Sequence, residues 1–598
     1  MTSPPSSPVL PHAVRVAGTV FAAVLGGLLL LAIIAAAWVG VRGFLAYGHL
    51  RDAQTTAALA RDQLTDPATA ADAIAEIADD TSAARGLTTD PVWSAAEHLP
   101  WVGPQLAAVS TMTAAVDDVA GSALTPLVEV AGSFDVDSLR PQDGRIDLTP
   151  FTAIQDAAAA GTAELVDAAD TVSAIDRDPL VTPVRTAVRE LSALLAETRD
   201  GAGAVARATA LLPAMLGADG PRTYLLLFQN NAEWRSLGGI TGAVAAIRTD
   251  GGALSLQAQA SSSDFPRYDD AVLPLDEEVL GIYGTRPGRY IQNVTQVPDF
   301  ALSGALAQEM WERETGETVD GVIAVDPVAL SYLLEATGPV TLPTGDELTA
   351  DNAVDLLLNE VYFRYEVPAE QDAFFAAAAA AVFEAVAGGG ADPAALLSAL
   401  TRAGDEHRLL LWSDHEEDQE LLADTTLAGG LPGTDDDTAR FGVFLNDGTG
   451  SKMDYYVTAD TVVGWDTCMI DDAGDAQGEA TLGVTITNTA PGADSLPRYI
   501  TGGGGFGVPA GTARTVGYLY LPEGWDLVDA EIDGDVGFGG GTHDGRRVLT
   551  FELDLESGEQ ASVFVTARPS EPGAPTVEAV STPRIGEGTR VVATCPPA

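Results

Sequence analysis

The stretch YLLLFQNNAEWRSLGG, Tyr224–Gly239, joins an apolar run directly to a cluster of polar and charged side chains. The run Tyr224–Phe228 is continuously apolar rather than alternating, which predicts a strand covered on both faces of a sheet. Polar groups at the carboxyl end of such a strand lie where open α/β sheets usually bind ligands. The binding candidates in this stretch are therefore Gln229, Asn230, Asn231, Glu233 and Arg235.

A purely structural role for these residues is the alternative. Asn230 and Asn231 can cap the turn into the next segment by satisfying backbone N–H groups. Glu233 can simply pair with Arg235. Neither role needs a ligand, so the stretch alone leaves both interpretations open.

The residues that follow alternate between strand-like and helix-like patterns. Residues 238–259 contain two strand-like runs joined at Asp250–Gly252, which indicates a hairpin. Residues 300–316 then predict an amphipathic helix, 319–326 a buried strand and 327–338 a second helix. This alternation predicts a layered α/β domain over residues 217–440.

Short strand-like runs with turn-rich spacing fill residues 441–598 and predict a β-sandwich. Cys468 and Cys595 lie near its two ends, without CxxC neighbours, and we expect them to form a disulfide between its first and last strands. The six histidines show no zinc spacing, so no structural metal is expected. A disulfide requires an oxidising compartment.

The amino-terminal part contains one apolar segment. Residues 16–41 carry no charge and reach about 39 Å as a helix, enough to cross a hydrocarbon core. We expect an uncleaved transmembrane helix after a cytoplasmic tail of residues 1–15. Arg15 lies before the segment and Arg42 after it, so charge does not fix the orientation. The expected disulfide favours a single-pass protein of the plasma membrane with its bulk outside the cytoplasm.

Residues 50–215 are rich in Ala, Leu, Asp and Thr at helical spacing and predict a helical bundle or stalk. The fold class predicted for the whole chain is therefore multidomain α+β. Its parts are a single N-terminal transmembrane helix, a helical bundle or stalk, an α/β layered domain and a C-terminal β-sandwich.

The charge of the chain is strongly negative, with 31 basic against 86 acidic residues and a net charge of −55. Such a surface repels polyanions, so no nucleic acid partner is expected. Against this background Arg286, Arg289 and Asn293 form a local basic island. Arginine suits phosphate or carboxylate, so the island is a candidate anion site. The alternative is that Arg286 and Arg289 pair with the acidic run 276–278.

The opening stretch, its Asp-Gly-Gly hairpin and the later NDGTGSKMDYYV (446–457) together resemble the bacterial family known as domain of unknown function 4012 (DUF4012). The resemblance covers about residues 217–456 and names no reaction. The matching residues are Asn230, Asn231, Ala232, Glu233, Arg235, Gly238, Gly239, Lys452, Asp454, Tyr455 and Tyr456.

The order of elements is also similar, more distantly, to the LytR-CpsA-Psr glycopolymer transferases. That resemblance implies a substrate of polyprenyl-linked pyrophosphate glycan, transfer to the cell wall, arginine side chains as anion donors and Mg²⁺ held by an aspartate. It places Arg235, Asn293, Asp326 and Gln371 near the family's ordered positions. Arg364 is a further candidate anion donor, and Asp299 or Asp326 the candidate metal ligands.

Two functions follow as hypotheses. The first is an extracytoplasmic cell-envelope protein that binds a glycan, a cell-wall polymer or a partner. The second is a LytR-type phosphotransferase that moves a lipid-linked glycopolymer to the cell wall. A transferase requires its arginines to converge on a deep pocket, whereas a binding protein can have them dispersed in ion pairs.

Overall fold

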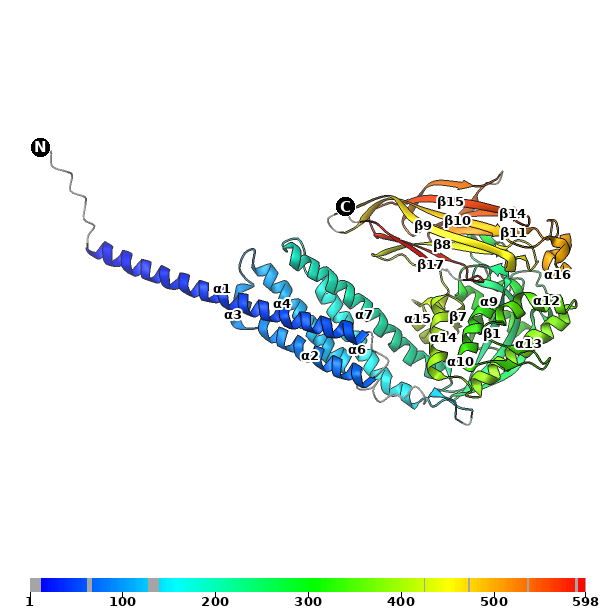
Figure 1. Cartoon of the computed structure of the whole chain (residues 1–598), viewed down its shortest axis with the longest axis horizontal. Coiled ribbons are helices and arrows are strands. Elements are labelled where there is room, and N and C mark those ends of the chain that lie inside the picture. Colours follow the sequence, from blue (N-terminus) through cyan, green and yellow to red (C-terminus); the bar gives the residue numbers. More distant parts are fainter. Residues whose placement is uncertain are drawn as a thin grey trace. The chain divides into compact units, whose positions relative to one another are not determined.

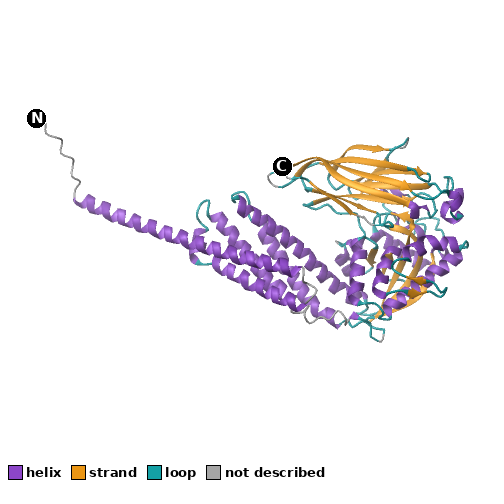
Figure 2. Cartoon of the chain, viewed as in Figure 1, coloured by secondary structure: helices purple, strands orange, loops and turns teal. Residues whose placement is uncertain are grey.

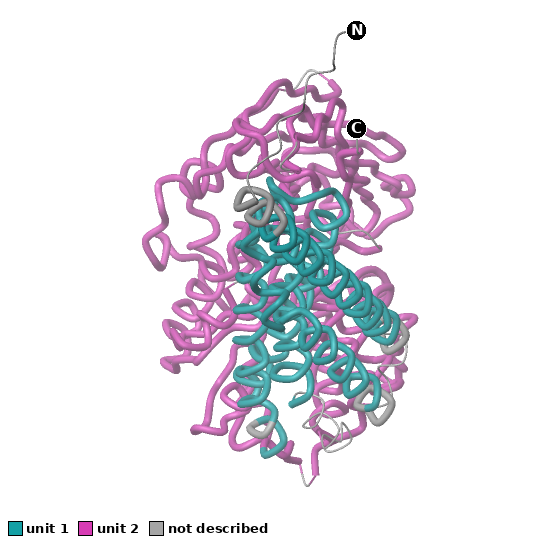
Figure 3. The backbone as a smooth tube through the Cα atoms, turned by 90° about the vertical axis from the view of Figure 1, so that its left-hand side faces the viewer, with its two compact units in different colours: residues 1–135, 149–212 teal, residues 136–148, 213–598 magenta. Residues whose placement is uncertain are grey.

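The computed structural model describes residues 12–61, 67–126, 139–142, 144–423, 425–471, 474–534, 537–586 and 590–596. It is a multidomain α+β protein with an N-terminal apolar helix and several β-sheets. Two compact units are present, one of Met1–Asp135 with Thr149–Leu212 and one of Val136–Leu148 with Pro213–Ala598 (Figure 3). The predicted boundary between residues 440 and 441 lies inside the second unit, so it stays a prediction.

The described residues of the first unit form helices joined by short connections (Figure 2). Apolar side chains at helical spacing, among them Met112, Leu165 and Val188, form its core. Its elements are α1 (His12–Arg61), α2 (Pro67–Thr88), α3 (Pro91–Ala96), α4 (Gly103–Asp118), the π-helical η1 (Val119–Leu124), α6 (Thr149–Ser173) and α7 (Thr182–Met215). The last three residues of α7 belong to the second unit.

Helix α1 contains one segment, Val20–Ala57, that is long and apolar enough to cross a membrane. A signal sequence near an N-terminus would pass the same test of length and composition. The first part of the segment is exposed, whereas Ala46 and Ala53 farther along are buried in the helical unit. The predicted tail of residues 1–15 lies largely outside the described residues.

The second unit begins with a five-stranded mixed sheet in the order β3-β2-β1-β4-β7. Strands β1 and β4 are parallel and the other neighbours are antiparallel. The strands are β1 (Arg222–Arg235), β2 (Gly238–Asp250), β3 (Ala253–Ser261), β4 (Gly321–Val325) and β7 (Leu409–Ser413). The expected hairpin is therefore present as β2 and β3.

The sequence pattern suggested that the apolar strand ends at Phe228, but the strand is longer. Strand β1 continues to Arg235 through an irregularity in its pairing with β2 between Asn230 and Trp234. Such a bulge bends a strand and redirects its side chains. The polar cluster therefore lies on the strand itself and not in a loop beyond it.

Helices flank this sheet (Figure 1). Leu225 and Leu227 of β1 share one core with Leu306 of α9, so this helix packs against the sheet. The predicted helices over 300–316 and 327–338 are α9 and α10. The elements are α8 (Glu277–Tyr283), α9 (Phe300–Thr315), α10 (Pro327–Thr337), the hairpin β5 (Val340–Thr341) and β6 (Glu347–Leu348), α11 (Ala353–Asp355), the π-helical η5 (Leu356–Glu360), α12 (Val361–Arg364), α13 (Pro368–Ala387), α14 (Pro393–Asp405) and α15 (Glu416–Leu422).

Two further sheets follow, with strand orders β12-β15-β10-β9 and β13-β14-β11-β8-β16-β17. Their inward residues, such as Leu482 and Phe551, share one apolar core, which also contains Trp234 and Phe374 of the preceding region. The strands are β8 (Thr438–Asp447), β9 (Val457–Ile470), β10 (Ala476–Asn488), β11 (Ala513–Tyr520), β12 (Trp525–Ile532), β13 (Gly539–His543), β14 (Arg546–Leu555), β15 (Gln560–Pro569), β16 (Thr576–Ser581) and β17 (Arg590–Thr594).

A disulfide joins Cys468 to Cys595, with their Cα atoms 5.8 Å apart. The predicted pairing is confirmed. Cys468 lies on β9, which is the second strand of this region and not its first, and Cys595 follows β17. The bond therefore closes the chain's last strand onto the neighbouring sheet.

Candidate functional site

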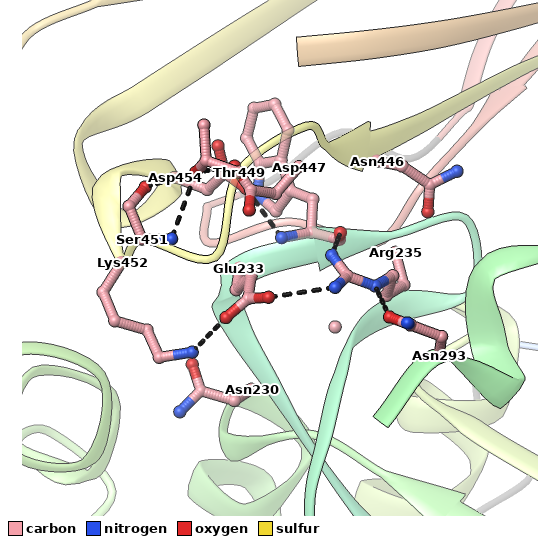
Figure 4. Close-up of polar contacts among 12 residues, drawn as sticks. Asn230, Glu233, Arg235, Asn293, Asn446, Asp447, Thr449, Ser451, Lys452 and Asp454 are labelled. Atoms are coloured by element: carbon pink, nitrogen blue, oxygen red, sulfur yellow. Dashed lines mark hydrogen bonds and ion pairs between the residues drawn. The ribbon is translucent and has the colours of Figure 1, made fainter. Parts of the chain in front are cut away.

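The charged residues of the opening stretch form a buried cluster with Lys452, the only lysine in the sequence (Figure 4). Glu233 accepts a hydrogen bond from Arg235 Nη2 at 2.9 Å through Oε1, and its Oε2 pairs with Lys452 Nζ. Arg235 also donates from Nε to Asn293 Oδ1 at 3.0 Å and from Nη1 to the Trp234 carbonyl at 2.7 Å. One carboxylate therefore neutralises part of the charge of two buried cations.

Backbone contacts tie the same stretch to strand β8 and the turn that follows it. The Trp234 N–H donates to Asp454 Oδ2 at 2.7 Å, and the Ser236 N–H donates to Asn446 Oδ1 at 2.9 Å. Ser236 Oγ donates to the Gln296 carbonyl at 2.7 Å. These bonds satisfy buried polar groups, so part of the opening stretch serves to join the mixed sheet to the carboxyl-terminal strands.

Burial and neighbouring charges shift the ionisation of this cluster. Burial alone would raise the pKa of Glu233, but Lys452 and Arg235 outweigh it and hold that pKa below its ordinary value. Burial would likewise lower the pKa of Lys452, yet Glu233 keeps it raised. Burial raises the pKa of Asp447 to about 7, and the charge of Glu233 adds to this shift. Burial, followed by the charge of Asp447, raises the pKa of Asp454 well above its ordinary value.

The two predicted metal ligands are helix caps. Asp299 Oδ1 accepts from the Leu302 N–H at the start of α9, and Asp326 Oδ1 accepts from the Ala329 N–H at the start of α10. Asp326 Oδ2 accepts from Asn231 Nδ2 at 3.0 Å and from Arg408 Nη1 at 2.8 Å.

The surroundings of Asp326 do not fit Mg²⁺. Both oxygens of Asp326 already accept hydrogen bonds, one of them from a buried guanidinium that repels a cation. Within the described ranges, no group of three or more His, Cys, Asp or Glu side chains could hold a metal.

The remaining predicted arginines lie at separate places. Arg286 is exposed, and Arg289 Nε donates to the Tyr268 carbonyl at 2.8 Å. Arg364 pairs at the surface with Asp346 at 2.7 Å and Glu360 at 2.6 Å. In the part of the chain that the structure describes, neither Arg286 nor Arg289 forms an ion pair with residues 276–278.

A cleft of about 1010 Å³ lies in the second unit beside the charged cluster. The predicted site residues that line it are Gln229, Asn230, Glu233, Lys452, Asp326 and Gln371. The strands β1, β2 and β3, helix α13 and the segments 450–452 and 497–506 supply most of its walls. The structure thus brings these six predicted residues to one cavity, and none of the predicted arginines lines it.

Aromatic rings form part of the cleft wall. Tyr362 stacks on Tyr499 with ring centroids 5.3 Å apart and meets Phe375 edge-on at 6.3 Å. Asn230 Nδ2 donates to Tyr362 Oη at 2.6 Å, which links the wall to the opening stretch. Phe506 lines the same cleft and is 47% exposed.

Two polar side chains of the cleft are buried without a partner. Gln229 on β1 and Thr241 on β2 are neighbours across the hairpin and both line the cleft. Gln229 Nε2 and Thr241 Oγ1 have no hydrogen-bond partner among the described residues, although the side chains are 4% and 0% exposed. Buried polar groups normally have partners, so these two unpaired atoms are unusual.

Several site residues were not singled out from the sequence. The sequence does not indicate the partner of Arg408, because Asp326 lies 82 positions away. Asp447 begins a glycine-rich stretch, whose composition predicts a turn and not a buried carboxylate. Its proximity to the only lysine was the one available signal. Tyr499 and Phe506 lie in a glycine-rich segment that carries no recognisable motif.

The fold and site define a protein with an N-terminal apolar helix and an α+β unit, in which a buried charged cluster adjoins an open cleft. Residues 219–362 match the family described as "Protein of unknown function (DUF4012)". The resemblance to DUF4012 is thereby confirmed for this segment, which is less than half of the chain. Lys452 and Asp454 of the cluster lie outside it. The chain matches no curated protein.

Proposed function

We propose that the chain is a membrane-anchored cell-envelope protein whose cleft binds an envelope glycan. Helix α1 is the anchor, since its segment Val20–Ala57 has the length and apolarity of a membrane span. The disulfide Cys468–Cys595 supports an extracytoplasmic location, because disulfides persist in oxidising compartments.

The observation that carries the glycan proposal is the pair of unpartnered groups on Gln229 and Thr241 in a cleft that also has an aromatic wall. A sugar ring presents apolar C–H faces and a rim of hydroxyl groups. Aromatic faces such as that of Tyr499 pack against the C–H faces of a sugar, and amide and hydroxyl side chains form hydrogen bonds with its hydroxyl groups. The cleft supplies both kinds of group.

The transferase alternative receives less support from the same geometry. None of the four arginines predicted to bind anions lines the cleft. Two of them are already engaged by carboxylates, Arg235 by Glu233 and Arg364 by Asp346 and Glu360. The cations that do line the cleft are Lys452, which is paired with Glu233, and Arg498. A pyrophosphate would therefore meet few free positive groups.

The proposal is tested by calorimetric titration of the full chain in detergent with soluble peptidoglycan strands of alternating N-acetylglucosamine and N-acetylmuramic acid. We expect saturable binding, weakened about fivefold in Tyr499→Ala, because a lost aromatic contact is worth on the order of 1 kcal/mol. Phe363→Ala is the matched control, since Phe363 is an exposed ring that does not line the cleft. Its binding should equal that of the parent.

Thr241→Val extends this test to the hydrogen-bonding groups. Because Thr241 Oγ1 has no partner among the described residues, the change should weaken glycan binding without lowering the stability of the protein. Absence of binding, or binding that neither variant alters, would contradict the proposal. Titration with a polyprenyl pyrophosphate, with and without Mg²⁺, tests the transferase alternative in the same preparation.

A further inference from the structure

One end of the helical unit displays apolar side chains in a short connection. Residues 97–102 join α3 to α4, and Leu99, Trp101 and Val102 within it are 53%, 90% and 51% exposed. Trp101 also has a φ of +67°, a conformation that is uncommon for a bulky residue. The connection therefore holds a large ring outward at a cost in backbone energy.

This connection lies at the end of the unit from which α1 emerges (Figure 1). Asp90 caps the first turn of α3 and binds α1 with both carboxylate oxygens. It accepts from Trp38 Nε1 at 3.4 Å and pairs with Arg42 Nε at 2.9 Å. Trp38 and Arg42 mark the end of the uncharged run of residues 16–41. Helix α3 thus begins where α1 would leave the hydrocarbon layer.

A second connection reaches the same place. Residues 174–181 join α6 to α7, and Gln105 in the first turn of α4 holds them. Gln105 Nε2 donates to the Pro179 carbonyl at 2.8 Å, and its Oε1 accepts from the Val181 N–H at 3.0 Å. Gln105 Nε2 also contacts the Trp101 carbonyl at 3.3 Å, and Val181 is 54% exposed. Two loop tips with exposed apolar groups therefore adjoin each other beside the emerging helix.

We propose that Leu99, Trp101, Val102 and Val181 insert into the boundary between headgroups and acyl chains of the membrane that α1 crosses. The inference rests on the proposed anchoring by α1. That anchoring carries these side chains to a lipid surface, and tryptophan is enriched at that depth because its ring is apolar while its N–H remains polar.

The contact is apolar rather than electrostatic. The second connection carries Asp176 and Asp178, both exposed, with only Arg177 between them. Two carboxylates gain nothing from an anionic lipid surface. Insertion should therefore occur in phosphatidylcholine bilayers and should not weaken when the salt concentration is raised.

The test uses the full chain in nanodiscs of dibrominated phosphatidylcholine, whose bromine atoms quench nearby tryptophan fluorescence, compared with unbrominated nanodiscs. Of the eight tryptophans, Trp38 and Trp101 are placed to meet the lipid boundary. Bromination should quench about two tryptophans in the parent and about one in Trp101→Ser. Trp38→Phe, as the matched variant on the anchor itself, should also retain about one quenched tryptophan.

The outcomes separate the two proposals. If Trp101→Ser loses as much fluorescence to bromination as the parent, while Trp38→Phe loses less, the anchor stands and the loop contact is wrong. If bromination quenches no tryptophan and the chain does not enter nanodiscs, the anchoring is wrong and the loop contact with it. Quenching that disappears at high salt would contradict an apolar contact.

Discussion

Two arginines of the second unit form ion pairs of similar length in very different surroundings. Arg235 lies 2.9 Å from Glu233 with both side chains under a tenth exposed, whereas Arg364 lies 2.7 Å from Asp346 with its side chain 39% exposed. Water competes for the second pair and is largely excluded from the first. The contrast teaches that the distance between two charges says little about their contribution to stability. That contribution depends on whether the partner left behind is buried or solvated when one charge is removed.

Removing a cation from the buried cluster should give the largest effect. Lys452→Met leaves Glu233 with Arg235 as its remaining cationic partner, and breaking a buried pair in this way costs about 3–5 kcal/mol of unfolding free energy. The measurement is denaturant-dependent hydrogen exchange of peptides from β1 in the full chain. The double variant Glu233→Gln/Lys452→Met should not recover the loss, since the buried Arg235 is then the cation left without its carboxylate partner. A loss below about 1 kcal/mol would mean that the cluster behaves like the surface pair.

The buried cluster should also respond to pH. Asp447 has a pKa of about 7 when folded and about 3.9 when unfolded, so the folded state holds the proton more tightly between these values. Its stabilising contribution is complete below about pH 4 and is lost as the pH rises through about 7. Asp447→Asn should therefore raise the unfolding free energy at pH 8, by on the order of 2–4 kcal/mol, and remove this part of the pH dependence.

Unfolding of parent and Asp447→Asn is compared from pH 4 to pH 8, with the exposed Asp554→Asn as control. The difference between parent and Asp447→Asn should grow with pH, whereas Asp554→Asn should change little. A difference that stays constant over this range would show that Asp447 is ionised throughout.

The surface pair should give the smallest effect. Arg364→Met removes the partner of Asp346 and Glu360, but water can solvate both carboxylates, so unfolding free energy should fall by no more than about 1 kcal/mol. The same hydrogen-exchange measurement, applied to peptides from α12, checks this value. Added salt should reduce the difference further. A loss comparable to that in Lys452→Met would remove the contrast between the two regions.

The sequence predicts local structure better than the site. The strands and helices near the cluster follow from local patterns, namely the continuous apolar run at Leu225–Phe228, the glycine turn at 250–252 and the helical periodicity. The two cysteines pair as expected. The sequence pattern did not predict that β1 stays buried beyond Phe228. Polar residues usually mark the end of a buried strand, whereas in β1 they accompany a bulge. The contact between Glu233 and Lys452 spans 219 positions, and no pattern within either segment indicates it.

The cleft shows a further limit. Gln229 and Thr241 become neighbours only through the register of β1 and β2, which shifts by one residue beside them. The aromatic wall depends on the packing of Tyr362 on Tyr499, two residues from separate regions of the sequence. Such features follow from tertiary packing, whereas secondary-structure propensity and hydrophobic periodicity describe only residues that are close in sequence.

Helix α1 is one unbroken helix of 50 residues from His12 to Arg61. At 1.5 Å per residue it is a rod of about 75 Å, without a flexible joint between its apolar part and the part that packs on α2. With α1 as the proposed anchor, its apolar part and the part that packs on α2 would tilt together as one rigid helix. The orientation of the helical unit would then be sensitive to the thickness of the bilayer.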